Sequence, residues 1–455
     1  MKNAGIMVAV LALIISGVPD AGACEVIVGP YLLDMQPTSV TICWESATKC
    51  SYELRYGAQE LDRSWQESKA VLFRCTELTD LEPGTTYTYR LLSGPYKYPD
   101  CSFRTPVLAE ETTRFAVYGD TRTDHGFHRQ GVGVLHRMQP DFVVHTGDWV
   151  EDGDVQEEWY TFFEVVASLF ARVPVIPVIG NHDNRTGTFY DQYFPMAVDD
   201  GGEPRRYYVY DRAGIRFLVL STEEPYVEGS PQYQWLVEEL EKGAADPSVQ
   251  HMIAALHRPP YNTGHHSDDS LEVAAVFPAL FSKYGVELVF AGHAHDYERS
   301  TADGVVYIVS GGGGAPNVWA IEDLRMNPDA NEFSQVYLAI IHACEVTATP
   351  DCLLVKAIDT AGKVRDEVEI GACQWGRAVT ADPSPEQGAD VQDLVSSGPD
   401  TVKCDCPPCE VGSAKDTSNG CASGKSFSPS PLWLLALLPL LLVAWRRRTA
   451  LGRRA

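Results

Sequence analysis

Hydrophobic and polar positions change their spacing along this chain, and the change divides it into two folded regions. Between residues 24 and 107, short runs alternate apolar and polar residues, as in Ser39–Trp44 and Tyr52–Tyr56, and turn residues separate them. Such alternation is typical of half-buried strands. From residue 112 to 372, continuous apolar runs are separated by loops and helix-like segments instead. The pattern predicts a small β-sandwich followed by a layered α/β domain.

The apolar runs of the second region are predicted to form its strands. Two segments between them, Glu157–Leu169 and Gln232–Lys242, have the spacing of amphipathic helices. The predicted strands are Phe115–Tyr118, Phe142–His145, Val175–Ile179, Phe217–Leu220, Met252–Leu256, Glu287–Phe290 and Val305–Val309.

The beginning of the chain has the pattern of a secretion signal. Lys2 precedes an apolar run over Ile6–Val18, and the small residues Ala21–Ala23 follow it. A membrane-spanning helix is the alternative, but the run is short and small residues end it. We therefore predict a signal peptide over residues 1–23.

The end of the chain has the pattern of an anchor. Leu432–Trp445 is nearly all apolar, Arg446–Arg448 follows directly, and Cys421 lies upstream. This arrangement resembles the C-terminal sorting tails of myxobacterial surface proteins, and a simple tail anchor is the alternative. We predict a membrane or sorting segment over residues 431–448, after a flexible linker over residues 373–430 that is poor in large apolar residues. The two ends predict a secreted protein anchored at the bacterial outer surface or in the periplasm.

Composition narrows the possible partners. The 455 residues are 45% hydrophobic, which is enough for packed cores, and their formal net charge is −26. Because a phosphate backbone requires a basic surface, this charge argues against binding to a nucleic-acid scaffold. The 12 cysteines fit an oxidising compartment, where disulfides persist, although their connectivity stays open.

Polar side chains of metal-ligand type follow five of the predicted strands. In α/β sheets, ligands bind beyond the carboxyl ends of the strands, so we expect these side chains to meet in one crevice. Glycines at four of the strand ends let the backbone approach a bound ion closely. The motifs are Gly119-Asp120, Gly147-Asp148, Gly180-Asn181-His182-Asp183, Leu256-His257 and Gly292-His293-Ala294-His295.

The donor atoms of these motifs indicate the kind of metal. Carboxylates, an amide oxygen and imidazoles without thiolates suit Fe, Mn or Zn. Two such ions a few ångströms apart clamp a phosphate group and turn a water into hydroxide at mild pH. A lone Gly-Asp is common in turns, and two histidines can pack in a core. Histidines two apart in a loop, as His293 and His295 are, favour ligation instead.

The ordered series of motifs resembles that of the calcineurin-like metallophosphoesterases. The extension Asp296–Arg299 and the glycine run Gly311–Gly314 are similar to the purple acid phosphatase branch. Leu81–Tyr89 resembles the fibronectin type III segment that holds the tyrosine corner. The resemblance covers roughly residues 25–370. It implies an α/β layered metallophosphoesterase domain, a β-sandwich core flanked by helices, after a fibronectin type III-like β-sandwich.

The resemblance also implies which residues hold the metals. Asp148 would bridge two ions, divalent or mixed-valence, drawn from Fe, Zn or Mn. The remaining ligands would be Asp120 and His295 in one site and Asn181, His257 and His293 in the other.

Other residues around the centre receive catalytic or substrate-binding roles from the same resemblance. His182 matches the residue that protonates the leaving group or stabilises the transition state. Asp183 would orient His182 or cap its loop. The stretch Arg258–Asn262, with His265 and His266, is similar to the stretch that supplies substrate-side groups, and an exposed loop is the alternative for both histidines.

Two positions depart from the family pattern. Where purple enzymes have the tyrosine that binds ferric iron, this chain has Glu151, and where many other members have a histidine, it has Arg122. The first metal site therefore lacks a familiar ligand, unless Glu151, His125 or His128 supplies it. Arg122 would instead bind the substrate phosphate bidentately or pair with a nearby carboxylate.

Three functions are compatible with these observations. The leading hypothesis is an extracellular metal-dependent hydrolase acting on small phosphate esters. The second is a surface adhesion module with a degenerate metal site, supported only by Arg122 and Glu151. The third, a nucleotide-specific phosphodiesterase, requires an aromatic pair for base stacking that the sequence does not reveal.

The carboxylate at position 151 predicts the colour of the protein. A tyrosinate-to-ferric charge-transfer band requires a phenolate on the metal, so we expect a colourless or pale protein with divalent ions. Glu151→Tyr is expected to create a coloured centre, and Glu151→Gln to weaken the Asp120-side metal if Glu151 is a ligand. Visible absorption spectroscopy of the purified protein tests this, and a charge-transfer band in the unmodified chain would contradict it.

Overall fold

The computed structural model describes residues 24–94, 96–108, 112–184, 186–198, 202–315, 327 and 329–373. The predicted signal peptide, nearly all of the predicted linker and the predicted C-terminal segment lie outside these residues. Within the described ranges, no helix is long and apolar enough to cross a membrane.

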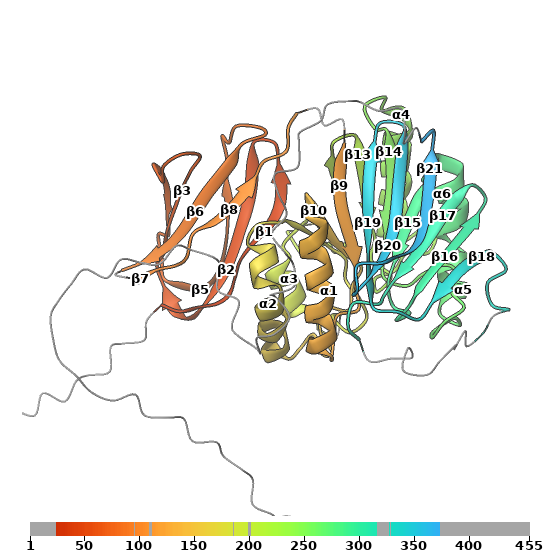
Figure 1. The fold of residues 1–455 in the computed structure, drawn as a ribbon, viewed down its shortest axis with the longest axis horizontal. Coiled ribbons are helices and arrows are strands. Elements are labelled where there is room, and N and C mark those ends of the chain that lie inside the picture. Colours follow the sequence, from red (N-terminus) through yellow and green to blue (C-terminus); the bar gives the residue numbers. More distant parts are fainter. Residues whose placement is uncertain are drawn as a thin grey trace, which may run out of the picture. The chain divides into compact units, whose positions relative to one another are not determined.

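Two antiparallel sheets form the first region and share one core (Figure 1). Trp44 is buried in that core, edge-on to Tyr52. The Tyr87 hydroxyl accepts a hydrogen bond from the backbone N–H of Glu82, within the segment predicted to form a tyrosine corner. The strands are β1 (Val26–Gln36), β2 (Ser39–Cys50), β3 (Glu53–Gly57), β4 (Arg63–Gln66), β5 (Val71–Leu78), β6 (Thr86–Ser93), β7 (Tyr96–Lys97) and β8 (Cys101–Arg104). Their orders are β1-β2-β5 and β4-β3-β6-β7, with β8 beside β6.

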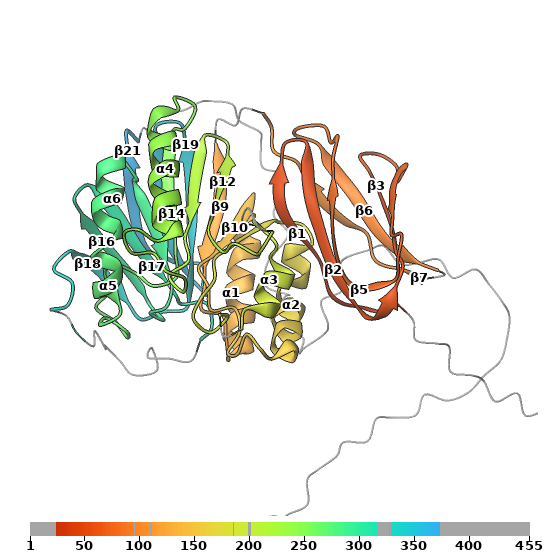
Figure 2. The ribbon, with the colours of Figure 1, turned by 180° about the vertical axis from the view of Figure 1, so that it is seen from behind.

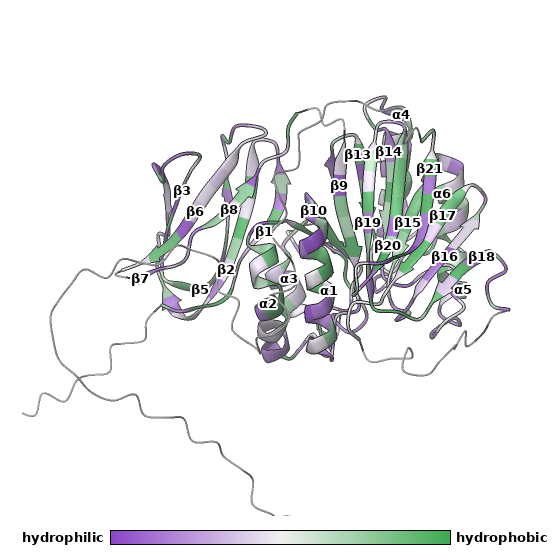
Figure 3. Cartoon of the chain, viewed as in Figure 1, coloured by the Kyte–Doolittle hydropathy of each residue, from purple (hydrophilic) through white to green (hydrophobic). Residues whose placement is uncertain are grey.

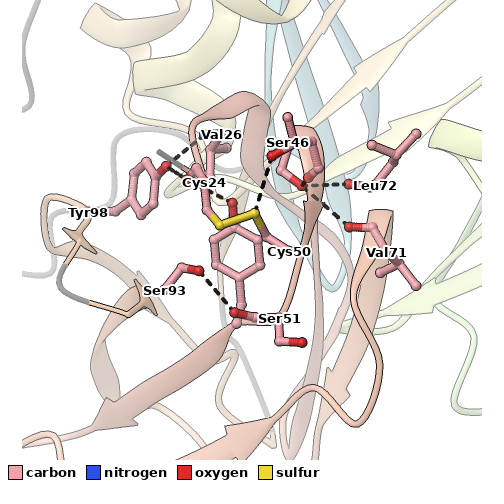
Figure 4. Close-up of a disulfide and its surroundings, with 11 residues drawn as sticks. Cys24, Val26, Ser46, Cys50, Ser51, Val71, Leu72, Ser93 and Tyr98 are labelled. Carbon is pink, nitrogen blue, oxygen red and sulfur yellow. Dashed lines mark hydrogen bonds between the residues drawn. A yellow bond between two sulfur atoms is a disulfide. The ribbon is translucent and has the colours of Figure 1, made fainter. Parts of the chain in front are cut away.

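Three disulfides brace the described part of the chain. Cys24–Cys50 ties the residues before β1 to the end of β2, and the nearby Tyr98 hydroxyl accepts from the N–H of Val26 at 2.7 Å (Figure 4). The other two described disulfides are Cys43–Cys75 and Cys352–Cys373.

Two further sheets form the second region. The first has the order β11-β10-β9-β19-β20-β21 and the second β12-β13-β14-β15-β17-β16-β18. β9, β10 and β11 run parallel to one another, as do β13, β14, β15 and β17. The strands are β9 (Thr113–Tyr118), β10 (Phe142–His145), β11 (Val175–Pro177), β12 (Tyr208–Arg212), β13 (Ile215–Val219), β14 (His251–Ala255), β15 (Leu288–Ala291), β16 (Tyr297–Ala302), β17 (Val305–Ser310), β18 (Ser334–Leu338), β19 (His342–Thr349), β20 (Cys352–Asp359) and β21 (Val364–Gly371).

The two sheets of the second region face each other, and helices cover their outer faces. Phe115 and Phe142 of one sheet pack against Phe217 of the other in a shared core, and the central strands are strongly hydrophobic (Figure 3). A second cluster joins the first sheet to helices α1 to α3, and a third joins the second sheet to α4 to α6 (Figures 1 and 2). The helices are α1 (His125–Met138), α2 (Gln156–Phe170), α3 (Thr188–Tyr193), α4 (Pro231–Ala245), α5 (Ser270–Ala274) and α6 (Phe277–Tyr284).

The predicted elements of the second region match the structure closely. Every predicted strand and both predicted helices are present, with ends that shift by no more than a few residues. Helix α1 was not predicted, because its sequence contains Gly126, Gly131 and Gly133 and few large apolar residues. The antiparallel strands β19 to β21 were not predicted either, and they complete the first sheet beside β9.

A buried glutamate links the first region to the helices of the second. Glu45 on β2 is 3% exposed, and its carboxylate accepts hydrogen bonds from Gln156 on α2 and the hydroxyls of Tyr160 and Tyr193. Buried carboxylates are tolerated where several donors satisfy them. These bonds therefore fix β2 against α2 and α3.

His251 makes part of the stability of the second region depend on pH. Its Nδ1 lies 2.7 Å from Glu287 Oε2, and its Nε2 lies 2.7 Å from the Thr349 carbonyl oxygen. Burial alone would lower the pKa of His251, but Glu287 and the carbonyl outweigh burial and raise it above its ordinary value. The charged form donates both hydrogen bonds, so its stabilisation is complete below the unfolded pKa of about 6.5 and is lost as pH rises through the folded pKa.

We therefore expect His251→Gln to lower the free energy of unfolding by about 1.5–3 kcal/mol at acidic pH and by less at alkaline pH. Denaturant unfolding of both proteins between pH 5.5 and 8.5 measures this difference. A difference that stays constant or grows with pH would show that His251 is neutral in the folded protein.

Candidate metal centre

Five loops from two sheets meet at one edge of the second region. The loops after β9, β10 and β11 come from the first sheet, and those after β14 and β15 from the second. Backbone hydrogen bonds join them: the N–H of Asp120 donates to Gly147, and that of Gly292 donates to His257, both at 2.9 Å. The parallel strands of each sheet thus bring all five predicted motifs together, as expected at carboxyl ends of strands.

Tight backbone turns place the side chains of these loops inward. Asp120, Asp148 and His293 all have positive φ angles, of 57°, 54° and 69°. Such angles cost energy in residues other than glycine and concentrate at functional sites. A Cβ atom on Gly180 would overlap Asp148 Oδ1, so glycine is required there for the two loops to approach.

The predicted ligands form two groups that share one carboxylate. Asp148, His257 and His293 present ligand atoms within 4.8 Å of one another, and so do Asp120, Asp148 and His295. All five residues are buried. Asn181 joins the first group, because its Oδ1 lies 3.1 Å from His257 Nε2. Asp148 therefore occupies the position between two groups that was predicted for a bridging ligand.

Hydrogen bonds orient the donors within each group. His257 Nδ1 lies 2.9 Å from the Thr146 carbonyl oxygen, which can only accept, so Nδ1 carries the proton. Nε2 then presents its lone pair toward Asp148 Oδ1 at 3.2 Å. On the other side, both Asp120 oxygens accept from the N–H of His293 at 3.0 Å. Such contacts fix the ring orientation and proton position that metal ligation needs.

The electrostatics of the centre fit bound cations. Burial and the Asp148 carboxylate raise the pKa of Asp120 well above its ordinary range. Burial, then His257 and Arg258, lower the pKa of His293, so its imidazole is neutral. Arg122 lies 3.4 Å from Asp148, but the buried carboxyl of Asp120 and the neutral imidazole of His293 form a donor set that additional positive charge would stabilise. Two metal ions would supply that charge, so the residues present fit the pair of ions that the sequence predicts.

His182 lies beside this donor set. Its N–H donates to Asp148 Oδ1 at 3.0 Å, and its Nδ1 donates to the Glu151 carbonyl oxygen at 2.6 Å. Nε2 faces the centre, 3.9 Å from Asp148 Oδ2. The imidazole is 19% exposed, so a substrate can reach it.

Asp183 has the contacts of a loop cap. Oδ2 accepts from the backbone N–H groups of Asp148 and Gly180, and Oδ1 accepts from that of Trp149. The described contacts of His182 place its imidazole on the Glu151 carbonyl instead. Of the two roles predicted for Asp183, the contacts favour loop capping, which holds Asp148 in place.

Arg122 and Glu151 bind each other beside the second group. Arg122 Nη1 lies 2.5 Å from Glu151 Oε2, its Nε lies 3.4 Å from Asp148 Oδ2, and its Nη2 lies 3.4 Å from His295 Nε2. Glu151 also accepts from the Thr123 hydroxyl. Among the described residues, the candidate metal groups include neither Glu151 nor His125 or His128.

The predicted substrate-side histidines differ in position. His266 joins His293 and Asp269 in a further group of potential ligands, and its ring centroid lies 4.3 Å from that of His293. His265 packs edge-on against His266, with ring centroids 3.7 Å apart. Asp269 was not predicted: its Oδ2 lies 2.9 Å from His293 Nε2 and 2.6 Å from Arg258 Nη1. Its only signal in the sequence is its place three residues after His266, and acidic residues are common in loops.

Comparisons with known proteins agree with this geometry. The model of the calcineurin-like phosphoesterase family matches residues 113–297. The probable purple acid phosphatase 20 of Arabidopsis thaliana is 28% identical over 58% of this chain and 67% of its own length. Purple acid phosphatase 15 of the same plant is also 28% identical, over 54% of each chain. This chain thus spans between about half and two thirds of the length of these relatives.

A solved structure shares the fold. The purple acid phosphatase PPD1 from seeds of yellow lupin, Lupinus luteus, superimposes with a TM-score of 0.63 over 79% of this chain and 77% of its own, at 17% identity. That identity supports the fold alone. The family match extends from β9 to the start of β16 and so includes all five loops of the centre.

Asp148→Ala is expected to remove metal from both groups, because the carboxylate belongs to each. Elemental analysis of the purified variant should find at least one ion per chain fewer than in the parent. Asp211→Ala, which changes an exposed aspartate paired with Arg216, serves as the control and should keep the parental metal content. A variant of Asp148 that retained two ions would remove it from the bridging role.

Proposed function

We propose that this chain, which carries a calcineurin-like metallophosphoesterase domain over residues 113–297, hydrolyses small phosphate esters outside the cytoplasm through a dinuclear metal centre. The family match and the purple acid phosphatase relatives support a phosphoester hydrolase. The observation that carries the dinuclear proposal is the pair of ligand groups that share Asp148. Two ions of Fe, Zn or Mn would be held by Asp120, Asp148 and His295 on one side and by Asp148, Asn181, His257 and His293 on the other.

The bound ions and the residues of this chain would have different roles in the hydrolysis. Two such ions would neutralise the phosphate and activate a water for attack. Asp148 and Asp183 keep the donor set rigid, because Asp183 fixes the backbone on either side of the bridging carboxylate. A preorganised site of this kind does not need to rearrange as charge develops on the phosphate.

His182 is proposed to protonate the departing alcohol oxygen. Its Nδ1–H is held by the Glu151 carbonyl, so the ring is fixed and Nε2 is the nitrogen that faces the centre. In the imidazolium form, Nε2 carries a proton toward the leaving group. A positioned acid of this kind typically accelerates a reaction by about 10²–10⁴-fold.

Arg122 is proposed to bind the phosphate. Its guanidinium lies next to Asp148 and His295, and Glu151 and Thr123 surround its outer side. A planar guanidinium matches two phosphate oxygens, so it can orient the group without adding a metal ligand. In this proposal Glu151 positions Arg122.

The proposed compartment is supported by the disulfides. The three disulfides of the described residues persist in an oxidising environment and are rare in the cytosol. We therefore retain a secreted protein, held at the cell surface by the segment over residues 431–448, as part of the proposal. Its substrates would be phosphate esters from the surroundings.

Metal content and turnover together test the proposed function. The full chain is purified, its metal removed with a chelator and then restored with Zn²⁺, Mn²⁺ or Fe²⁺, while release of phosphate from p-nitrophenyl phosphate is measured. We expect two ions per chain, loss of turnover on chelation and recovery on reloading. One ion and no turnover would contradict the proposal and support the adhesion module.

His182→Ala is expected to separate catalysis from metal binding. The variant should keep the parental metal content and lose roughly 10²–10⁴-fold in kcat, because it removes a proton donor and leaves the ligands intact. Steady-state kinetics with elemental analysis of the same sample measure both. Loss of metal in this variant would reassign His182 as a ligand.

A further inference from the structure

A cavity of about 250 Å³ lies next to the metal centre and has no role in the chemistry above. The first turn of α1, the start of α2 and the loops after β9 and β10 line it. Helices α1 and α2 lie side by side over the first sheet (Figure 1). Arg122 and Glu151 form its border toward the centre, and Glu151 is also the residue whose carbonyl holds His182. The cavity therefore adjoins the pair formed by Arg122 and Glu151 at the edge of the centre.

Unpaired polar atoms gather on the walls of this cavity. His125 Nδ1 and His128 Nδ1 are buried without a hydrogen-bond partner among the described residues, and both residues line it. His128 is completely buried, and its Nε2 already lies 3.4 Å from the Tyr118 hydroxyl. Burying an imidazole nitrogen without a partner costs free energy, so such atoms indicate a missing ligand.

The other residues that line the cavity provide carboxylate acceptors and aromatic side chains. Glu158 uses Oε2 to accept from the N–H of Asp152, and Glu151 uses Oε2 for Arg122 and Thr123. Glu151 Oε1 lies 3.9 Å from His182 Nδ1, so Glu158 is the carboxylate that remains for a ligand in the cavity. Trp149 and Phe162 supply flat apolar surfaces.

These features together indicate which class of ligand fits the cavity. Two carboxylates disfavour an anion, and a purely apolar group would leave the imidazole nitrogens unpaired. A metal ion or an ammonium group needs acceptors that converge on one point, but the groups of potential ligands among the described residues include none from this cavity. Donors and acceptors distributed around an apolar wall match a ligand with several hydroxyl groups, because each hydroxyl both donates and accepts.

We infer that this cavity binds the alcohol portion of the substrate and selects polyol phosphates, esters whose alcohol carries further hydroxyl groups. The inference rests on the proposed function. The alcohol would extend from the phosphate past Arg122 and Glu151, and its hydroxyls would pair with His125, His128 and Glu158. The cavity is smaller than the roughly 300–1,000 Å³ of sites for drug-sized ligands, which fits the alcohol of a small ester.

Two esters with the same carbon skeleton test the inference in the full, metal-loaded chain. Glycerol 2-phosphate carries two hydroxyl groups that isopropyl phosphate lacks. We expect kcat/KM for glycerol 2-phosphate to exceed that for isopropyl phosphate by roughly tenfold or more. Free glycerol should also inhibit hydrolysis of isopropyl phosphate competitively, whereas propan-2-ol should not.

Variants of the residues that line the cavity test whether the cavity causes the preference for glycerol 2-phosphate. His128→Phe fills it while retaining a ring against Phe162, and His125→Ala removes a more exposed donor without altering the core. Both should bring the ratio of the two kcat/KM values close to one and leave turnover of isopropyl phosphate unchanged. His136→Ala, on the same helix but outside the cavity, is the control and should retain the full preference.

The outcomes separate this inference from the proposed function. Equal kcat/KM values in the parent protein, or a preference that survives both variants, would show that the cavity holds only water. A preference for ethanolamine phosphate over both esters would overturn the inference in favour of a cationic alcohol. If none of these esters nor p-nitrophenyl phosphate is hydrolysed, the proposed function itself fails, and the inference fails with it.

Discussion

The buried carboxylate of Asp148 is the constraint on which the rest of the centre depends. It is almost inaccessible to water, lies 3.2 Å from one histidine and accepts the backbone N–H of another, and belongs to both groups of potential ligands. A second buried carboxylate, Asp120, lies in the adjoining group. Arg122 lies 3.4 Å from Asp148, yet burial and the Asp148 carboxylate still raise the pKa of Asp120 well above its ordinary range. The site is therefore unfavourable as a protein core and would be stabilised by bound cations.

The fold supplies the rigidity that this arrangement needs. Parallel strands from two facing sheets end at the same edge, so five short loops deliver ligands without long flexible connections. Positive φ angles at Asp120, Asp148 and His293 add strain that the surrounding hydrogen bonds compensate. The Asp183 side chain accepts hydrogen bonds from both Asp148 and Gly180 and so fixes the loops after β10 and β11 against each other.

Much of this arrangement was predictable from the sequence because strand ends and ligand types occur together. The buried strand Phe142–His145 was predicted with its exact bounds, and each motif residue proposed as a ligand lies in the cluster. Helix α1 was missed because its glycines weaken the helical pattern. Asp269 was missed because a single loop carboxylate has no distinguishing pattern. For Arg122, pairing with a nearby carboxylate was one of the two roles predicted from the sequence, but only the three-dimensional structure shows that its partner is Glu151.

Anomalous X-ray scattering from crystals of the metal-loaded chain would show whether Asp148 bridges two ions. We predict two metal peaks about 3.5–4 Å apart, one on each side of the Asp148 carboxylate and both within bonding distance of it. A single peak, or two peaks of which only one is bound by Asp148, would contradict the claim that this residue bridges a dinuclear centre.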